Sequence, residues 1–351
     1  MNSYCQHNNC LRMDTGSNKG NMKRIITITS ILLLSLTATL AQERNDRFHR
    51  TTLLSSEDSL QLAVLYCTPD SEFAPKGVLQ LVHGMCEHKE RYIPFMDYMA
   101  QNGWICVMHD HRGHGESVHS SSELGYFYEG GYSAMIDDVK VVNDWIRKTF
   151  PGMKIDMLGH SMGSMVVRGY AKRYDETISS LVVCGSPSYD EASKLGIQMT
   201  RRIIQRSGGL ARPAKIQEMA FKEHRRKFQN EASPNAWICS DVSVVNAYDR
   251  DPLCTFQFTA NGFYNLFSLM QYCYDKKGWS IQHPSMPMLF ISGKDDPCIY
   301  SERQFYDAVD MMKAVGYMNV SSKLYPGMRH EILNEKGKKE VWDDVLTFIG
   351  R

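Results

Sequence analysis

Residues 154–163, Lys-Ile-Asp-Met-Leu-Gly-His-Ser-Met-Gly, lead from a short apolar run into a turn of small residues. Residues 164–170 then have the pattern of a packed helix. The stretch predicts a strand, a sharp bend at Ser161 and a helix, which presents the serine hydroxyl at the top of a sheet. Such a bend leaves no room for large side chains two residues on either side of the serine, where Gly159 and Gly163 stand. The alternative is a glycine-rich turn without a chemical role.

Strand-like runs alternate with helical patterns along most of the chain. Two alternating segments near the start, 51–55 and 60–66, predict a β-hairpin. Further strands are expected at 78–82, 104–108, 154–158, 181–184, 288–292 and 321–325, and helices near 91–101, 132–149, 164–170, 301–315 and 338–349. This alternation predicts an α/β fold with a mostly parallel sheet and helices on both of its faces.

The alternation is interrupted between Pro187 and Pro287, where the chain has helical patterns and no strand-like run. Because the chain leaves the predicted sheet after one strand and returns to it for the next, we predict that residues 188–286 form an inserted helical cap or lid. The core would then consist of residues 48–187 and 287–351. An independent helical domain is the alternative.

The first 41 residues have two parts. Residues 1–21 are polar and without periodicity, and we interpret them as an upstream extension from a misplaced start. Residues 22–41 hold a basic head, a short apolar run and small residues, which is the order of a secretory signal peptide. We therefore expect an exported protein, periplasmic or secreted. A membrane-anchored or cytoplasmic protein is the alternative.

The composition of the 351 residues is that of an ordinary globular protein, with 43% hydrophobic and 23% charged residues. A net charge of +1 and the lack of a basic tail argue against a nucleic-acid partner. The cysteines after residue 41 are scattered without a C-x-x-C pair, which disfavours a zinc site. We expect mostly free thiols.

Three residues that follow predicted strands suit nucleophilic catalysis. A serine hydroxyl becomes a strong nucleophile only beside a base that a third group orients. Asp295 and Asp296 follow the strand expected at 288–292, and His330 follows the last strand. We predict Ser161 as the nucleophile, His330 as the general base and Asp296 as the orienting carboxylate. Asp295 is the alternative acid, and otherwise we expect it to cap the next turn.

Attack by the serine creates an oxyanion, which needs hydrogen-bond donors already in place. We predict the backbone N–H of Met162, directly after the nucleophile, and that of Met85 in the loop His83-Gly84-Met85. The histidine-rich loop at 109–117 is expected to brace its neighbours rather than to bind a metal. No metal and no organic cofactor are expected.

The predicted cap carries an apolar set and a basic set of residues. The apolar set either lines a cleft for an acyl chain over Ser161 or packs the helices together. It comprises Ile203, Ile204, Met219, Phe221, Phe256, Phe258, Phe263, Leu266, Phe267, Leu269 and Met270. The basic set either solvates the outer face or makes a transient contact with an anionic membrane surface. It comprises Arg201, Arg202, Lys222, Arg225, Arg226 and Lys227.

Several motifs in order resemble the monoglyceride lipase and lysophospholipase branch of the α/β-hydrolases, the serine aminopeptidase-like family. They are His83-Gly84-Met85 with Glu87-His88 and Arg91-Tyr92, then 110–117, 159–163, Asp251-Pro252-Leu253, 293–296 and 326–331. The likeness runs from about residue 50 to the C-terminus. Ser164 departs from the pattern, where another small residue such as glycine is usual, and is small enough to leave the bend intact.

The resemblance implies an eight-stranded α/β-hydrolase sheet, a helical cap and a triad of Ser161, Asp296 and His330. It also implies hydrolysis of monoacylglycerols, lysophospholipids or similar single-chain lipid esters without a cofactor. We therefore expect a serine hydrolase that cleaves carboxylic esters through an acyl-enzyme. The alternatives are a peptidase, thioesterase or small-ester esterase on the same triad, or a catalytically silent binding protein on the same fold.

Overall fold

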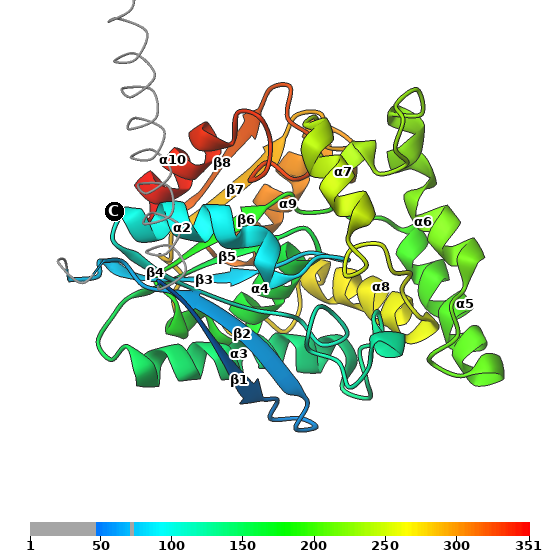
Figure 1. The fold of residues 1–351 in the computed structure, drawn as a ribbon, viewed down its shortest axis with the longest axis horizontal. Helices are drawn as coiled ribbons and strands as arrows, with labels where there is room; N and C mark the ends of the chain where they lie inside the picture. Colours follow the sequence, from blue (N-terminus) through cyan, green and yellow to red (C-terminus); the bar gives the residue numbers. More distant parts are fainter. Residues whose placement is uncertain (1–46, 71–73) are drawn as a thin grey trace, which may run out of the picture. The chain divides into compact units, whose positions relative to one another are not determined.

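The computed structural model describes residues 47–70 and 74–351 (Figure 1). The expected upstream extension, 1–21, and the expected signal peptide, 22–41, lie outside the described residues. Within the part that is described, no helix combines the length and apolar character needed to cross a membrane.

One sheet of eight strands, counted over the described residues, runs through the molecule in the order β1-β2-β4-β3-β5-β6-β7-β8. β1 and β2 form the expected hairpin, and β2 pairs antiparallel with β4. The other neighbours are all parallel, as the βαβ alternation predicted. The bounds are β1 Phe48–Leu54, β2 Gln61–Cys67, β3 Gly77–Val82, β4 Trp104–His109, β5 Ile155–His160, β6 Ser180–Cys184, β7 Met288–Gly293 and β8 Val320–Tyr325.

Helices cover both faces of this sheet. They are α2 Ile93–Gln101, α3 Gly131–Thr149, α4 Met162–Tyr174, α9 Glu302–Val315 and α10 Lys338–Ile349, with short 3₁₀ turns η1 Lys89–Tyr92, η2 Ser121–Glu123, η3 Asp175–Thr177 and η5 Pro297–Ile299. Every residue of β3 is buried, and its side chains alternate between two cores. Val78 and Val82 pack with apolar residues of α3 and α4, whereas Leu79 and Leu81 pack with those of α2 and α10. Burial on both faces explains why β3 is a continuous apolar run.

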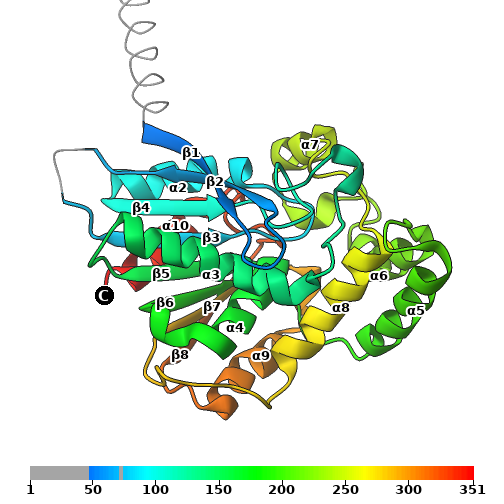
Figure 2. The ribbon, with the colours of Figure 1, turned by 90° about the horizontal axis from the view of Figure 1, so that it is seen from below.

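Residues 188–286, which we call the cap, hold four α-helices and one 3₁₀ turn between β6 and β7, and no strand occurs among these described residues. The bounds are α5 Ala192–Ser207, α6 Ala214–Lys227, η4 Ala236–Ile238, α7 Val242–Arg250 and α8 Ala260–Tyr274. Figures 1 and 2 both show these helices beyond the carboxyl ends of the parallel strands. The cap therefore lies at the end of the sheet where the predicted site residues emerge.

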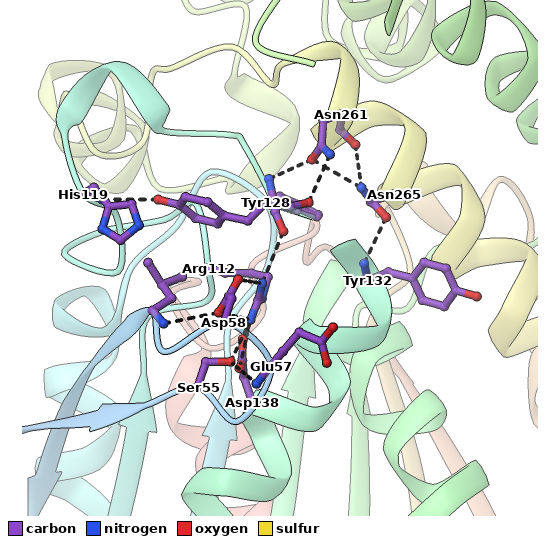
Figure 3. Close-up of polar contacts among 12 residues, drawn as sticks. Ser55, Glu57, Asp58, Arg112, His119, Tyr128, Tyr132, Asp138, Asn261 and Asn265 are labelled. Carbon is purple, nitrogen blue, oxygen red and sulfur yellow. Dashed lines mark hydrogen bonds and ion pairs between the residues drawn. The ribbon is translucent and has the colours of Figure 1, made fainter. Parts of the chain in front are cut away.

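A buried polar network holds the loop after β4 in place and joins it to α8 (Figure 3). The Arg112 guanidinium donates to Asp138 at 2.7 Å and to Asp58 at 2.9 Å. Asn265 of α8 accepts a 3.0 Å bond from the Tyr132 backbone at the start of α3. Arg112 is fully buried, so these carboxylates compensate a charge that would otherwise be costly. The loop braces its neighbours, as the sequence predicted.

The eight cysteines from Cys67 to Cys298 are all buried free thiols in the described part of the chain. The prediction of mostly free thiols is confirmed there. Such thiols pack as small apolar side chains.

Candidate active site

Ser161 stands on the bend between β5 and α4. Its backbone has φ 54° and ψ −119°, a conformation that a residue with a side chain adopts only under constraint. The Ser161 N–H donates to the Cys184 carbonyl at 2.9 Å, which ties the bend to β6. A Cβ added at Gly163 would lie 2.3 Å from the Val82 carbonyl oxygen, and one added at Gly159 would lie 2.4 Å from the Gly163 oxygen. The bend is as tight as the sequence predicted.

His330 and Asp296 meet this serine from two other strand ends. The Nε2 atom of His330 lies 2.8 Å from Ser161 Oγ, and its Nδ1 atom lies 2.9 Å from Asp296 Oδ2. Asp296 follows β7 and His330 follows β8. The three residues predicted from the order of motifs thus form one hydrogen-bonded series from carboxylate to imidazole to hydroxyl.

The structure distinguishes the two consecutive aspartates. Asp296 is buried, and it also accepts bonds from Ser292 Oγ at 2.9 Å and the Cys298 N–H at 2.8 Å. Burial by itself would raise the pKa of Asp296, but His330 and these donors outweigh it and lower the pKa below its usual value. Asp295 is exposed. The expectation that Asp295 caps the next turn is wrong, because the bond to Cys298 makes Asp296 the cap of η5.

The backbone N–H groups of the two predicted oxyanion donors, Met85 and Met162, have no hydrogen-bond acceptor within the described chain, so they can donate to a substrate oxygen. Met162 begins α4, where the helix dipole favours negative charge. A 2.8 Å bond between His83 Nδ1 and the Gly84 carbonyl fixes the peptide plane that carries the Met85 N–H. A Cβ on Gly84 would lie 2.8 Å from Ser161 Cβ, so only glycine lets this loop approach the serine.

A second polar network connects the loop after β3 to both Ser161 and His330. Glu87 Oε1 lies 2.8 Å from His160 Nδ1, and the other ring nitrogen of His160 lies 3.2 Å from the His330 carbonyl. Arg91 forms a bidentate pair with Glu331 at 2.8 and 2.7 Å. Sequence analysis named these residues only as parts of motifs and missed this positioning role.

Glu87 and His160 each stabilise the charged form of the other. Burial would raise the pKa of Glu87, but His160 and Arg91 lower it to about 2. Burial would likewise lower the pKa of His160, but Glu87 outweighs it and raises the pKa. A protonated His160 can donate from both ring nitrogens, one to Glu87 and one to the His330 backbone.

Two groups of described residues could each offer three metal-ligand atoms, His88 with Asp251 and Cys254, and Asp296 with Cys298 and His330. In each group the histidine and the carboxylate are already hydrogen-bonded to each other. Burial raises the pKa of Cys254 and of Cys298, which disfavours the thiolate that a metal would need. Neither group includes a residue of the histidine-rich loop.

A cavity of about 260 Å³ opens over Ser161 and His330. From the predicted apolar set, Phe221, Phe256, Leu266, Phe267 and Met270 line it. The cleft interpretation is wrong for the others: Phe258, Phe263 and Leu269 are buried in the core, Met219 is exposed, and Ile203 and Ile204 do not reach the cavity. From the basic set, Arg225 lines the cavity instead of lying only on the outer face.

An eight-stranded, mostly parallel sheet with helices on both faces and a serine on a strand–helix bend defines an α/β-hydrolase. Residues 74–337 match the family described as serine aminopeptidase, S33, and the chain belongs to this family.

Similar proteins agree with this class. The chain is 26% identical over 286 residues to a monoacylglycerol lipase of Mycolicibacterium smegmatis. This match covers 80% of the chain and 90% of the lipase. It is also 26% identical to a monoglyceride lipase homolog of Monkeypox virus, with 78% and 90% covered. A thermostable carboxyl esterase from Bacillus coagulans, solved with glycerol, superposes with a TM-score of 0.78 at 26% identity, covering 86% of this chain and 97% of that one.

Four buried histidines, His83 of the oxyanion loop and His109, His111 and His114 packed next to it, predict acid sensitivity. Burial lowers the pKa of each, to about 4 for His109 and His114. Below about pH 6.5 these histidines become protonated in the unfolded chain, whereas in the folded chain they stay neutral until the pH is lower. The free energy of unfolding should therefore fall between about pH 6.5 and 4, by up to about 1.4 kcal/mol per pH unit for each histidine.

His109→Phe tests this account by urea denaturation across that pH range. Neither ring nitrogen of His109 has a hydrogen-bond partner among the described residues, so the substitution removes no such bond. We expect the free energy of unfolding of this variant to fall less steeply with decreasing pH, by up to about 1.4 kcal/mol per pH unit, because one histidine no longer contributes. His119 is exposed, and His119→Phe provides the matched control for replacing a histidine by phenylalanine. A wild-type slope in His109→Phe would contradict the account.

Proposed function

We propose that this protein is a serine hydrolase that cleaves carboxylic esters of single-chain lipids, of the monoacylglycerol or lysophospholipid type, through an acyl-enzyme on Ser161. The observation that carries the proposal is the hydrogen-bonded series from Asp296 through His330 to Ser161, which opens into a cavity with one largely apolar wall. The monoacylglycerol lipase among its relatives gives independent support for the same substrate class.

Each residue has a chemical task in this reaction. His330 Nε2 accepts the Ser161 proton as Oγ bonds to the ester carbonyl carbon, and the Met85 and Met162 N–H groups stabilise the resulting oxyanion. His330 then gives its proton to the departing alcohol oxygen as the ester C–O bond breaks. Water, deprotonated by the same imidazole, attacks the acyl-enzyme, and the fatty acid leaves as Ser161 recovers its proton.

The apolar wall supports a long acyl chain as substrate. Met85, Met165, Phe256, Leu266, Phe267 and Met270 contribute to it from the oxyanion loop, α4 and the cap. Each methylene buried against such a wall contributes about 0.8 kcal/mol. We further propose that the cap acts as a lid, and that its basic outer residues contact an anionic membrane surface when the protein collects its substrate.

A peptidase that recognises a free amino terminus would need a carboxylate with capacity to bind it. Three carboxylates besides the triad line the cavity, and each already accepts hydrogen bonds. Glu87 is bound by His160 and Tyr92, and Glu331 by Arg91. Asp190 accepts from the Ala192 N–H at 2.8 Å and from the Tyr300 hydroxyl at 3.4 Å. Their engagement favours an ester over an amino-terminal peptide.

A chain-length series of p-nitrophenyl esters, run beside aminoacyl amides, tests the proposed reaction. We expect kcat/KM for the esters to rise up to about fourfold per added methylene until the cavity is filled. Ser161→Ala should lose at least about 10⁴-fold in kcat because no acyl-enzyme can form. Preference for amides would contradict the ester assignment, and no turnover of either class would favour a silent binding protein.

The two aspartates supply a matched pair of variants. Asp296→Asn should lower kcat by about 10²- to 10⁴-fold, because an amide cannot hold His330 with Nδ1 protonated as a carboxylate does. Asp295→Asn should change kcat by less than about threefold, since its side chain is exposed. Steady-state kinetics on one ester decides the matter, and a larger loss in Asp295→Asn would reverse the assignment.

A further inference from the structure

The loop that carries the Met85 N–H lies against the cap. Residues 86–91, directly after Met85, contact residues 248–256, which we call the strap. The strap runs from the last turn of α7 toward α8. The contacts follow one another in antiparallel order, residue 86 with 256, residue 88 with 251 and residue 91 with 248. The strap therefore follows this part of the loop instead of touching it at a single point.

Asp251 connects the shape of the strap to the loop. Its Oδ2 atom lies 2.8 Å from His88 Nε2, and its Oδ1 atom accepts the Leu253 N–H at 2.8 Å. Burial would raise the pKa of Asp251, but His88 and the Leu253 N–H outweigh it and lower the pKa. Sequence analysis gave the motif at 251–253 no role. In the structure its aspartate shapes the turn after α7 and binds that turn to the loop.

The backbone of Cys86 shows why the loop needs this support. Its φ is 54°, in the left-handed region, where a residue with a side chain stays only when its surroundings hold it there. On the side of the core, the next residue, Glu87, is bound by His160 and Tyr92. On the side of the cap, the Cys86 thiol donates to the Phe256 carbonyl at 3.3 Å. The strap is therefore part of what keeps the loop in this conformation.

The conformation of Cys86 matters for catalysis because Met85 directly precedes it. Peptide units are planar, so a backbone rotation at Cys86 turns the peptide that it shares with Met85. His83 fixes the peptide on the other side of Met85. Met85 is thus held from the core on one side and, through Cys86, from the cap on the other. An oxyanion donor must already point at the developing charge, so a loop released from the strap would stabilise the oxyanion poorly.

We propose that His88 and Asp251 are positioning residues, and that the strap keeps the Met85 N–H in its donating position only while the cap contacts the loop. This inference rests on the proposed function. It also goes beyond it, because the cap then controls the reaction centre itself and not only the lining of the cavity. Displacement of the strap would lower the turnover of every ester, whatever its chain length.

Hydrolysis of p-nitrophenyl acetate tests this role, because its acyl group is too short to bury methylenes against the apolar wall. His88→Ala and Asp251→Ala should each lower kcat by about 10- to 100-fold, which is part of the loss expected for one missing oxyanion donor, with KM changed by less than about twofold. The double variant should lose no more than the weaker-acting enzyme of the two single variants, because both changes break the same contact.

Two further variants separate positioning from a loss of folding. Asp251→Asn can still accept from Leu253 and form a hydrogen bond with His88, so its kcat should stay within about threefold of the wild type. Cys86→Ala breaks the contact with Phe256 and leaves the strap itself unchanged, and it should lower kcat by about 3- to 10-fold.

An inhibitor supplies a readout that reduced stability alone would not change. Butylboronic acid forms a tetrahedral adduct with a serine Oγ and resembles the transition state of acyl transfer. Its inhibition constant should rise in His88→Ala and Asp251→Ala by about the factor by which kcat falls.

Tyr272→Phe is the matched control. The Tyr272 hydroxyl accepts a 2.9 Å bond from Arg173 Nε, which joins the cap to α4 and not to the oxyanion loop. Its loss should change kcat by less than about twofold. The role of the strap is refuted if His88→Ala and Asp251→Ala keep the wild-type kcat, if their losses multiply in the double variant, if only KM rises, or if Tyr272→Phe loses as much. In each of those cases the wild type still cleaves the ester. A wild type that cleaves neither p-nitrophenyl acetate nor p-nitrophenyl octanoate would refute the proposed function, and this inference with it.

Discussion

The left-handed backbone of Ser161 is the constraint on which the site depends. At φ 54° the chain reverses from β5 into α4 within one residue, so the hydroxyl projects from the edge of the sheet. The cost of this conformation is met by the surrounding structure, through the bond to Cys184 and the close packing of Gly163 on Val82. Because β7 and β8 run parallel to β5, their carboxyl ends bring Asp296 and His330 to the same edge.

Much of this arrangement could be predicted from local patterns. The central strands β3, β4, β5 and β6 are buried throughout and appear as apolar runs, and the small residues around Ser161 indicate the bend. The order of motifs then indicates which carboxylate region and which histidine belong together. Spacing and charge alone did not decide between Asp295 and Asp296, because the choice depends on how η5 turns the side chains after β7, although the resemblance implied Asp296.

The parts that escaped prediction depend on tertiary packing. The pairs Glu87–His160 and Arg91–Glu331 join residues far apart in the chain, and no periodicity indicates such contacts. Arg225 stands in a basic run, which suggests a solvated face. The spacing of Gln217, Phe221 and His224 was a signal for the inner face of α6, but only the position of the cap shows what that face meets.

The sheet and the cap divide the work of the proposed enzyme. The sheet edge supplies the hydroxyl, the imidazole, the carboxylate and the oxyanion donors, held by the networks around His83, His160 and Arg91. The cap supplies much of the cavity lining, so we expect it to decide which ester reaches an otherwise general reaction centre. Activation of Ser161 by His330 is the central claim. Reaction with an octyl fluorophosphonate, followed by peptide mass mapping, tests it most directly. The account predicts a single adduct on Ser161 in the wild type and none in His330→Ala. An unmodified Ser161 in the folded wild type, or equal labelling without the imidazole, would contradict it.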